Sequence, residues 1–159
     1  MNRRNVRISL VLLAAAGALM SVAIACGGDN EDNGASETPQ GTVAGATVYL
    51  EATEYAITGL DGGAITSPSA GAVTLEVHNE GTIDHEVVII KTDLDEAALP
   101  TSGTTVDENA AGDVVGEVEE FDAGTVESVT VNVEAGHYVL ICNIAGHYEQ
   151  GMYATLVVQ

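Results

Sequence analysis

Apolar and polar residues alternate along much of the chain from Ala46 onward, and this alternation limits the fold more than any other feature. Aliphatic side chains occupy every second position in Val73–Val77 and again in Val129–Val133. A period of two is typical of a strand with one face in a core and the other in solvent. Turn-forming pairs such as Ser67-Pro68 and Ala135-Gly136 separate the segments. Short strands with turns between them predict an all-β fold, an antiparallel sandwich or barrel.

Four further segments are expected to be strands. They are Val48–Leu50, Val87–Ile90, His137–Cys142 and Tyr153–Val158. Val87–Ile90 is uniformly apolar, which predicts a strand covered on both faces. Only Leu94–Leu99, which is followed by Pro100, indicates a helical turn.

The N-terminal segment has the pattern of an export signal, so residues 1–25 are predicted to be a signal peptide. Three arginines lie within the first seven positions, Ile8–Ile24 is apolar apart from two serines, and Ala23-Ile24-Ala25 precedes Cys26. This junction resembles the bacterial lipoprotein box, although Ala23 stands where leucine is usual. The resemblance implies cleavage before Cys26 and lipid attachment to its thiol. The alternative is an uncleaved membrane anchor, because about 17 apolar residues can just span a bilayer.

Residues 26–45 contain mostly Gly, Asp, Asn, Glu, Ser and Thr, with few apolar side chains. Such a composition does not support a packed core, so we expect a flexible acidic tether. A coil of this length reaches on the order of 25 Å. The predicted organisation is therefore a signal peptide at 1–25, a tether at 26–45 and a folded domain at 46–159.

The chain is strongly acidic. It has 24 acidic and 4 basic residues, for a formal net charge of −20, and Lys91 is the one basic residue outside the signal segment. Such a surface repels phosphate groups, which argues against nucleic-acid binding and against attraction to anionic lipids. The excess of carboxylates is consistent with steering toward a cationic redox partner or with a saline habitat, and the sequence leaves both open.

The segment Cys142–Met152 contains a thiol, an imidazole and a thioether within eleven residues. Cys142, His147 and Met152 are each separated from the next by four residues, and glycines at 146 and 151 allow the chain to turn back between two strands. These three side chains can therefore converge at one end of the sandwich. His85 stands at the start of an upstream strand and supplies a second imidazole.

Two imidazoles, one thiolate and one weak thioether form the ligand set of a blue copper site. Soft sulfur ligands favour Cu(I), whereas imidazole binds both oxidation states, so little rearrangement is needed when an electron arrives or leaves. The other two histidines have simpler interpretations. His78 lies on the polar face of its strand, and His137 lies on the opposite strand face from Cys142; neither is expected at the site.

On these residues the segment from Ala46 to Gln159 resembles the cupredoxins, and its ligand-loop spacing and leader are most similar to the auracyanin and halocyanin group. The resemblance implies a Greek-key sandwich and one copper ion held by His85, Cys142, His147 and Met152. Cupredoxins commonly place an asparagine after the first ligand histidine, where it steadies the ligand loop. Glu86 occupies that position here, and we expect Asn143 to take over part of the role.

The leading hypothesis is a one-electron carrier that cycles one copper ion between Cu(I) and Cu(II). It would be a monomer, lipid-anchored on the extracytoplasmic face of the cell membrane, that exchanges electrons with a protein donor and acceptor. Four protein ligands leave no position for a substrate, so we expect no enzyme activity. The alternative is an extracytoplasmic copper-delivery protein, although such proteins often use Met- and His-rich tracts, and Met152 is the one methionine outside the leader.

Overall fold

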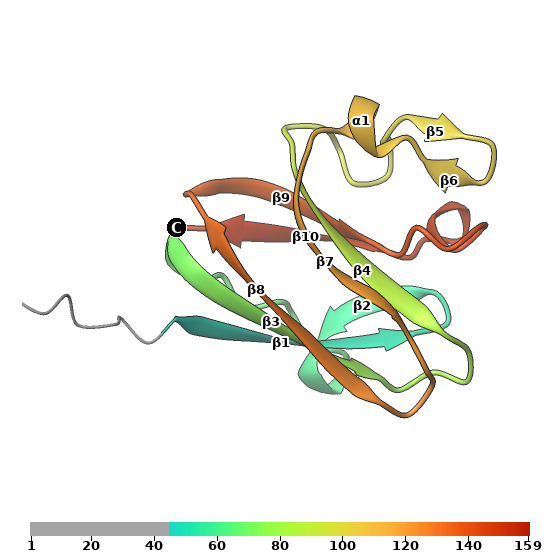
Figure 1. Ribbon diagram of the computed structural model, residues 1–159, viewed down its shortest axis with the longest axis horizontal. Coiled ribbons are helices and arrows are strands. Elements are labelled where there is room, and N and C mark those ends of the chain that lie inside the picture. Colours follow the sequence, from blue (N-terminus) through green and yellow to red (C-terminus); the bar gives the residue numbers. More distant parts are fainter. Residues whose placement is uncertain (1–44) are drawn as a thin grey trace, which may run out of the picture. The chain divides into compact units, whose positions relative to one another are not determined.

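A computed structural model describes residues 45–159 of the chain, and these residues form two facing β-sheets (Figure 1). The predicted signal peptide, Cys26 and all but the last residue of the predicted tether lie outside the described residues. Within residues 45–159, no helix has the length and apolar character needed to cross a membrane.

The first sheet has the strand order β2-β1-β3-β8. Its strands are β1 (Ala46–Thr53), β2 (Ala56–Gly59), β3 (Gly71–Asn79) and β8 (Val126–Val133). The β1–β3 pair is parallel, and the β1–β2 and β3–β8 pairs are antiparallel. The inward side chains are the alternating aliphatic residues, among them Val73, Leu75 and Val77, which are fully buried.

The second sheet has the order β10-β9-β4-β7, and all its pairs are antiparallel. Its strands are β4 (His85–Lys91), β7 (Asp113–Phe121), β9 (Gly136–Ile141) and β10 (Tyr153–Val158). The register between β4 and β7 shifts twice, between His85 and Val87 and between Ile89 and Ile90. Such irregularities bend a strand and redirect its side chains.

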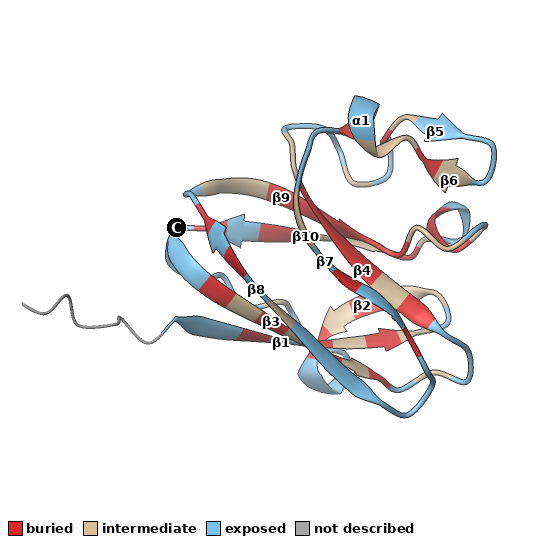
Figure 2. Cartoon of the chain, viewed as in Figure 1, coloured by how far each residue is buried: buried red, intermediate tan, exposed pale blue. Residues whose placement is uncertain are grey.

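Strand β4 is buried on both faces, as its uniformly apolar sequence predicts (Figure 2). Val87 and Ile89 join the core between the two sheets. Val88 and Ile90 face a second core, which the segment after β4 covers with Leu99, Val106 and Ala111. This segment contains β5 (Thr101–Ser102), β6 (Thr105–Val106) and α1 (Glu108–Ala111). Two 3-10 helices, η1 (Leu60–Gly62) and η2 (Tyr148–Gln150), complete the described elements.

The structure confirms the predicted all-β sandwich and every predicted strand. The turn expected at 94–99 is a single hydrogen-bonded turn, in which the Ala98 N–H donates to the Asp95 carbonyl (2.9 Å). It does not continue as a helix, because the Asp95 side chain accepts from the Ala97 N–H and Pro100 has no N–H to extend the turn. The α-helix of the described chain is α1, whose first turn is capped by Asp107.

Candidate metal centre

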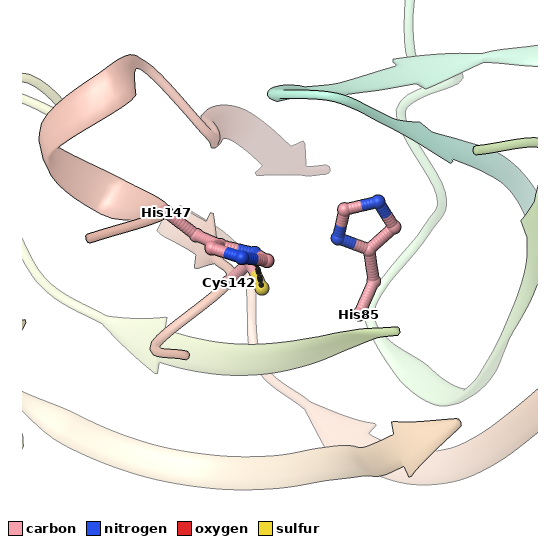
Figure 3. A group of neighbouring side chains, drawn as sticks. All are labelled: His85, Cys142 and His147. Carbon is pink, nitrogen blue, oxygen red and sulfur yellow. Dashed lines mark hydrogen bonds between the residues drawn. The ribbon is translucent and has the colours of Figure 1, made fainter. Parts of the chain in front are cut away.

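Three buried side chains, His85, Cys142 and His147, meet at one end of the second sheet (Figure 3). One nitrogen from each histidine and the cysteine sulfur all lie within 4.8 Å of one another. His85 is the first residue of β4, Cys142 follows β9, and His147 precedes η2. Because β4 and β9 are antiparallel neighbours, the start of one lies beside the end of the other. The sheet therefore brings together residues 57 positions apart in sequence.

The loop from Cys142 to Met152 is closed by its own backbone hydrogen bonds. The Cys142 N–H donates to the Met152 carbonyl (3.1 Å), and the Met152 N–H donates to the His147 carbonyl (3.2 Å). Gly146 (φ 86°) and Gly151 (φ 103°) occupy the left-handed region, which side chains rarely tolerate. These bonds hold Cys142 Sγ 3.2 Å from His147 Nδ1.

His85 is fully buried, and neither of its ring nitrogens has a hydrogen-bond partner. Among the residues that the structure describes, these are the only buried side-chain nitrogen or oxygen atoms without one. An unpartnered buried polar group costs about 1–3 kcal/mol. In Figure 3, the Nδ1 edge of the ring faces Cys142 and His147. A metal ion at that point would satisfy Nδ1, so the orphaned nitrogen fits a ligand role.

Asn79, which the sequence reasoning missed, fixes the loop before His85. Its side chain is buried, its Nδ2 donates to the carbonyls of Ile83 (2.9 Å) and Phe121 (3.3 Å), and its Oδ1 accepts from the Gly81 N–H (3.0 Å). One amide thus ties the loop to β7, the strand that pairs with β4 at His85. The available signal was an asparagine at a position where the strand alternation requires a buried residue.

Burial controls the protonation of the three side chains. It raises the pKa of the Cys142 thiol to about 11, while the backbone N–H groups of Glu86 and Ile144 act in the opposite direction. Burial also lowers the pKa of both histidines, and the charge of His147 lowers the pKa of His85 further. Both imidazoles are therefore neutral at pH 7, the form that can bind a metal.

Met152 is fully buried in the main core together with Cys142. It lies between Gly151, the residue that ends η2, and β10, and the backbone hydrogen bond from the Cys142 N–H places it at the same end of the sheet. Its sulfur is a weak, soft donor of the kind that blue copper sites use at a long distance.

Asn143 and Glu86 flank the site in different ways. The Asn143 side chain accepts from the Val106 N–H (2.6 Å) and donates to the Val106 carbonyl (3.2 Å) and to Glu108 Oε1 (2.8 Å). Asn143 therefore anchors the ligand loop to β6 and α1. Glu86 is half-buried, and burial and the charge of Glu117 raise the pKa of its carboxyl group. The Glu86 backbone N–H donates a hydrogen bond to the Cys142 sulfur, which lowers the pKa of the thiol.

The other two histidines lie outside this group. The His78 ring pairs with Glu76 (2.9 Å) on the outer face of β3. His137 Nδ1 lies 2.7 Å from the Thr92 carbonyl oxygen. Neither lies in the group of His85, Cys142 and His147, as predicted, and each has a partner that accounts for its position.

The donor set fits copper better than it fits the hard cations. A cysteine sulfur with two neutral imidazoles is too soft for Mg²⁺ or Ca²⁺, and a thioether such as that of Met152 favours Cu(I). The site accommodates one ion, because the three donor atoms surround a single point. Copper supplies a one-electron couple when bound, and the protein supplies a buried cage closed by hydrogen bonds.

Comparison with known proteins agrees with this geometry. The family model described as the sulfocyanin (SoxE) domain matches residues 42–159. No curated protein sequence matches the chain.

Several solved structures share the fold. Auracyanin B is 26% identical, with 72% of this chain and 88% of that chain covered and a TM-score of 0.53. The dithionite-reduced auracyanin from Roseiflexus castenholzii is 22% identical, with 72% and 97% covered and a TM-score of 0.54. Auracyanin A from Chloroflexus aurantiacus, described as a "blue" copper protein, is 23% identical, with 72% and 98% covered and a TM-score of 0.53. The predicted resemblance to the cupredoxins is confirmed.

Proposed function

Since the chain belongs to the sulfocyanin (SoxE) domain family of cupredoxins, we propose that it is a one-electron carrier tethered outside the cytoplasmic membrane. The observation that carries the electron-transfer role is the buried His85, Cys142 and His147 group, with the unpartnered nitrogens of His85. Met152 completes the proposed ligand set. No catalytic role is assigned, because four protein ligands fill the site.

The residues of the site support transfer without large motion. The backbone N–H groups of Glu86 and Ile144 stabilise the Cys142 thiolate, and the loop hydrogen bonds hold Cys142 beside His147. Asn79 holds the loop that carries His85. Because these hydrogen bonds hold the donor atoms in place, the site changes little in geometry when an electron arrives or leaves. His147 is slightly exposed, whereas His85 is fully buried, so we propose that electrons enter and leave through the His147 ring.

Copper binding tests the electron-carrier proposal directly. One equivalent of copper(II), added to the domain of residues 46–159, should give an intense blue absorption, and ascorbate should bleach it reversibly. Cys142→Ser should abolish the colour, because the thiolate–copper bond produces it, whereas Ser128→Ala on the outside of β8 should leave it unchanged. A wild-type domain that stays colourless would contradict the proposal. A domain that becomes blue but passes its copper to a chelator within minutes would instead indicate metal delivery.

We also propose that the domain is held outside the cell membrane through a lipid on Cys26. The support is the sequence alone: a cationic and apolar leader, small residues before Cys26, and an acidic tether. Mass spectrometry of the purified full-length protein should find a diacylglyceryl-modified cysteine at the N-terminus. Cys26→Ser should prevent lipid attachment. The variant should then either leave the detergent-extracted membrane fraction, after cleavage by another route, or keep its leader attached. An unmodified Cys26 within an intact leader would contradict the lipid anchor.

A further inference from the structure

Gly81 separates the outer edge of His85 from a carboxylate. A Cβ at position 81 would lie 3.0 Å from His85 Nε2 and 2.9 and 3.1 Å from the two carboxylate oxygens of Glu54. The backbone of Gly81 does not require glycine, because its φ lies outside the left-handed region. The absence of a side chain therefore leaves a gap across which the imidazole and the carboxylate face each other.

Hydrogen bonds from the loop that also carries His85 orient the Glu54 carboxylate beside this gap. Its Oε1 accepts hydrogen bonds from the Thr82 N–H (2.5 Å) and the Thr82 hydroxyl (2.9 Å). Neither contact with Thr82 uses Oε2. The Thr82 N–H also lowers the pKa of Glu54, so the side chain is a carboxylate at neutral pH.

His85 Nε2, on the far side of the ring from Nδ1, needs a hydrogen-bond acceptor. Nε2 is buried and has no acceptor in the described part of the chain, and in Figure 3 it points away from Cys142 and His147. A histidine that binds a metal through one nitrogen usually donates its other N–H to a carboxylate, a carbonyl or water. Glu54 is exposed, so rotation of its side chain can close the gap without moving the buried ring.

We propose that Glu54 is a positioning residue that accepts the Nε2–H of His85 and places a negative charge beside the copper ion. This inference rests on the proposed function. The hydrogen bond would fix the tautomer in which Nδ1 carries the free electron pair, on the side that faces Cys142 and His147. The charge would stabilise Cu(II) relative to Cu(I), and so would lower the reduction potential.

The test compares two variants of Glu54 with a matched control. Glu54→Gln removes the charge but keeps an acceptor, and Glu54→Ala removes both. Glu51→Gln is the control: it removes the same charge from β1, where the Glu51 carboxylate accepts from the N–H groups of Asp61 (2.9 Å) and Gly62 (3.0 Å) instead. The reduction potential is measured by voltammetry on the copper-loaded domain, and the His85 Nε2–H is followed by proton–nitrogen NMR in the diamagnetic Cu(I) form.

Both Glu54 variants should shift the Cu(II)/Cu(I) affinity ratio about tenfold toward Cu(I), a rise of about 59 mV for a one-electron couple. The Glu51→Gln variant should shift it far less. The Nε2 proton should keep its downfield position in Glu54→Gln and move upfield in Glu54→Ala. Gly81→Ala should reproduce the effect of Glu54→Ala, because the added Cβ displaces the carboxylate. Blue variants whose potential and Nε2 proton match the wild type, or match Glu51→Gln, would overturn the role of Glu54 and leave the electron-carrier proposal intact. A wild-type domain that binds no copper would overturn both.

Discussion

Cys142 Sγ lies 3.2 Å from His147 Nδ1, and the two residues are joined by a loop that closes on itself. Two side chains also attach the loop to its surroundings. Asn143 binds β6, and the hydroxyl of Tyr148 accepts from the Leu99 N–H (2.9 Å) and donates to the Glu96 carbonyl (2.8 Å). The distance between the Cys142 sulfur and the His147 nitrogen is therefore set by the fold of the loop.

The first prediction concerns stability in alkali without copper. Folding raises the pKa of Cys142 from an ordinary value of 9.0 to about 11, so the folded protein binds more protons than the unfolded chain between these values. The stability from this thiol is complete below pH 9 and is lost as the pH rises toward 11, by about 2–3 kcal/mol. Urea unfolding at pH 8, 9, 10 and 11 should show the loss.

The control for this prediction is Cys142→Ser. Folding also raises the pKa of Tyr148 and Lys91, so part of the alkaline loss belongs to other groups and should persist in the variant. The difference between the two proteins isolates the thiol. Parallel curves for the wild type and Cys142→Ser would show that Cys142 titrates as it does in the unfolded chain.

The second prediction is that His85→Leu stabilises the copper-free domain while it removes copper binding. Leucine replaces a buried ring whose nitrogens lack partners, so the free energy of unfolding should rise by on the order of 1 kcal/mol at pH 7. His137→Leu is the matched control, because His137 Nδ1 has a partner in the Thr92 carbonyl, and it should destabilise the domain by a similar amount. Urea unfolding measures both. A large destabilisation by His85→Leu would mean that the ring contributes packing that leucine cannot replace.

The strands and the loop from Cys142 to Met152 were predictable because both depend on residues close together in the sequence. Alternation identifies strands such as β3 and β8, and the spacing of Cys142, His147 and Met152 within one loop identifies the site. The strand β7 was not predicted. Its burial does not alternate, since only Val118 and Phe121 are buried, and the register shifts against β4 interrupt the period of two.

The residues around the site were harder to predict because their contacts depend on tertiary structure. Glu54 reaches Thr82 only because β1 lies parallel to β3, a pairing that alternation cannot reveal. Asn79 binds the carbonyl of Phe121, 42 residues away. The Asn143 side chain binds the Val106 N–H in β6 and the Glu108 carboxylate in α1, both more than 30 residues away in the sequence.

The third prediction concerns Asn79→Ala. Loss of the amide leaves the Gly81 N–H and two carbonyls without their partner, which should lower the free energy of unfolding by about 2–3 kcal/mol. The loop that carries His85 should loosen, and copper affinity should fall by about 10- to 100-fold, as for other residues that orient ligands. Asn132→Ala, on the exposed side of β8, is the control and should change stability by less than about 0.5 kcal/mol. Equal effects of the two substitutions in urea unfolding and copper titration would argue against this role.

The fourth prediction tests Met152 as a ligand. Met152→Gln exchanges a soft thioether, which favours Cu(I), for a harder amide oxygen, so the reduction potential should fall while the colour remains. Met152→Leu is close in volume but has no donor atom, and it should raise the potential. A tenfold change in the relative stability of the two oxidation states corresponds to about 59 mV in voltammetry. Equal potentials in the wild type and both variants would exclude Met152 from the ligand set.

The fifth prediction concerns the acidic groove along β7 and β8. Five carboxylates line it, from Glu117, Glu119, Glu120, Asp122 and Glu127. Its residue Phe121 pairs with His85, and the charge of Glu120 acts on His147, so the groove adjoins the copper site. Electron transfer to a small cationic oxidant such as a cobalt(III) amine complex should slow steeply with added salt, since exposed charges are screened beyond about 10 Å at 0.1 M.

Two variants that each remove one negative charge, one near the site and one far from it, test this last prediction. Glu120→Gln should lower the rate at low salt and flatten the salt dependence, because the lost charge lies beside the site. Asp113→Asn removes the same charge from the opposite end of β7, about 25 Å along the strand, and should leave both nearly unchanged. Stopped-flow measurements from 10 to 500 mM salt shorten the screening length from about 30 Å to about 4 Å, so the two variants should differ most at the lowest salt. Coinciding rates would mean that the net charge of the domain, and not the groove, attracts the oxidant.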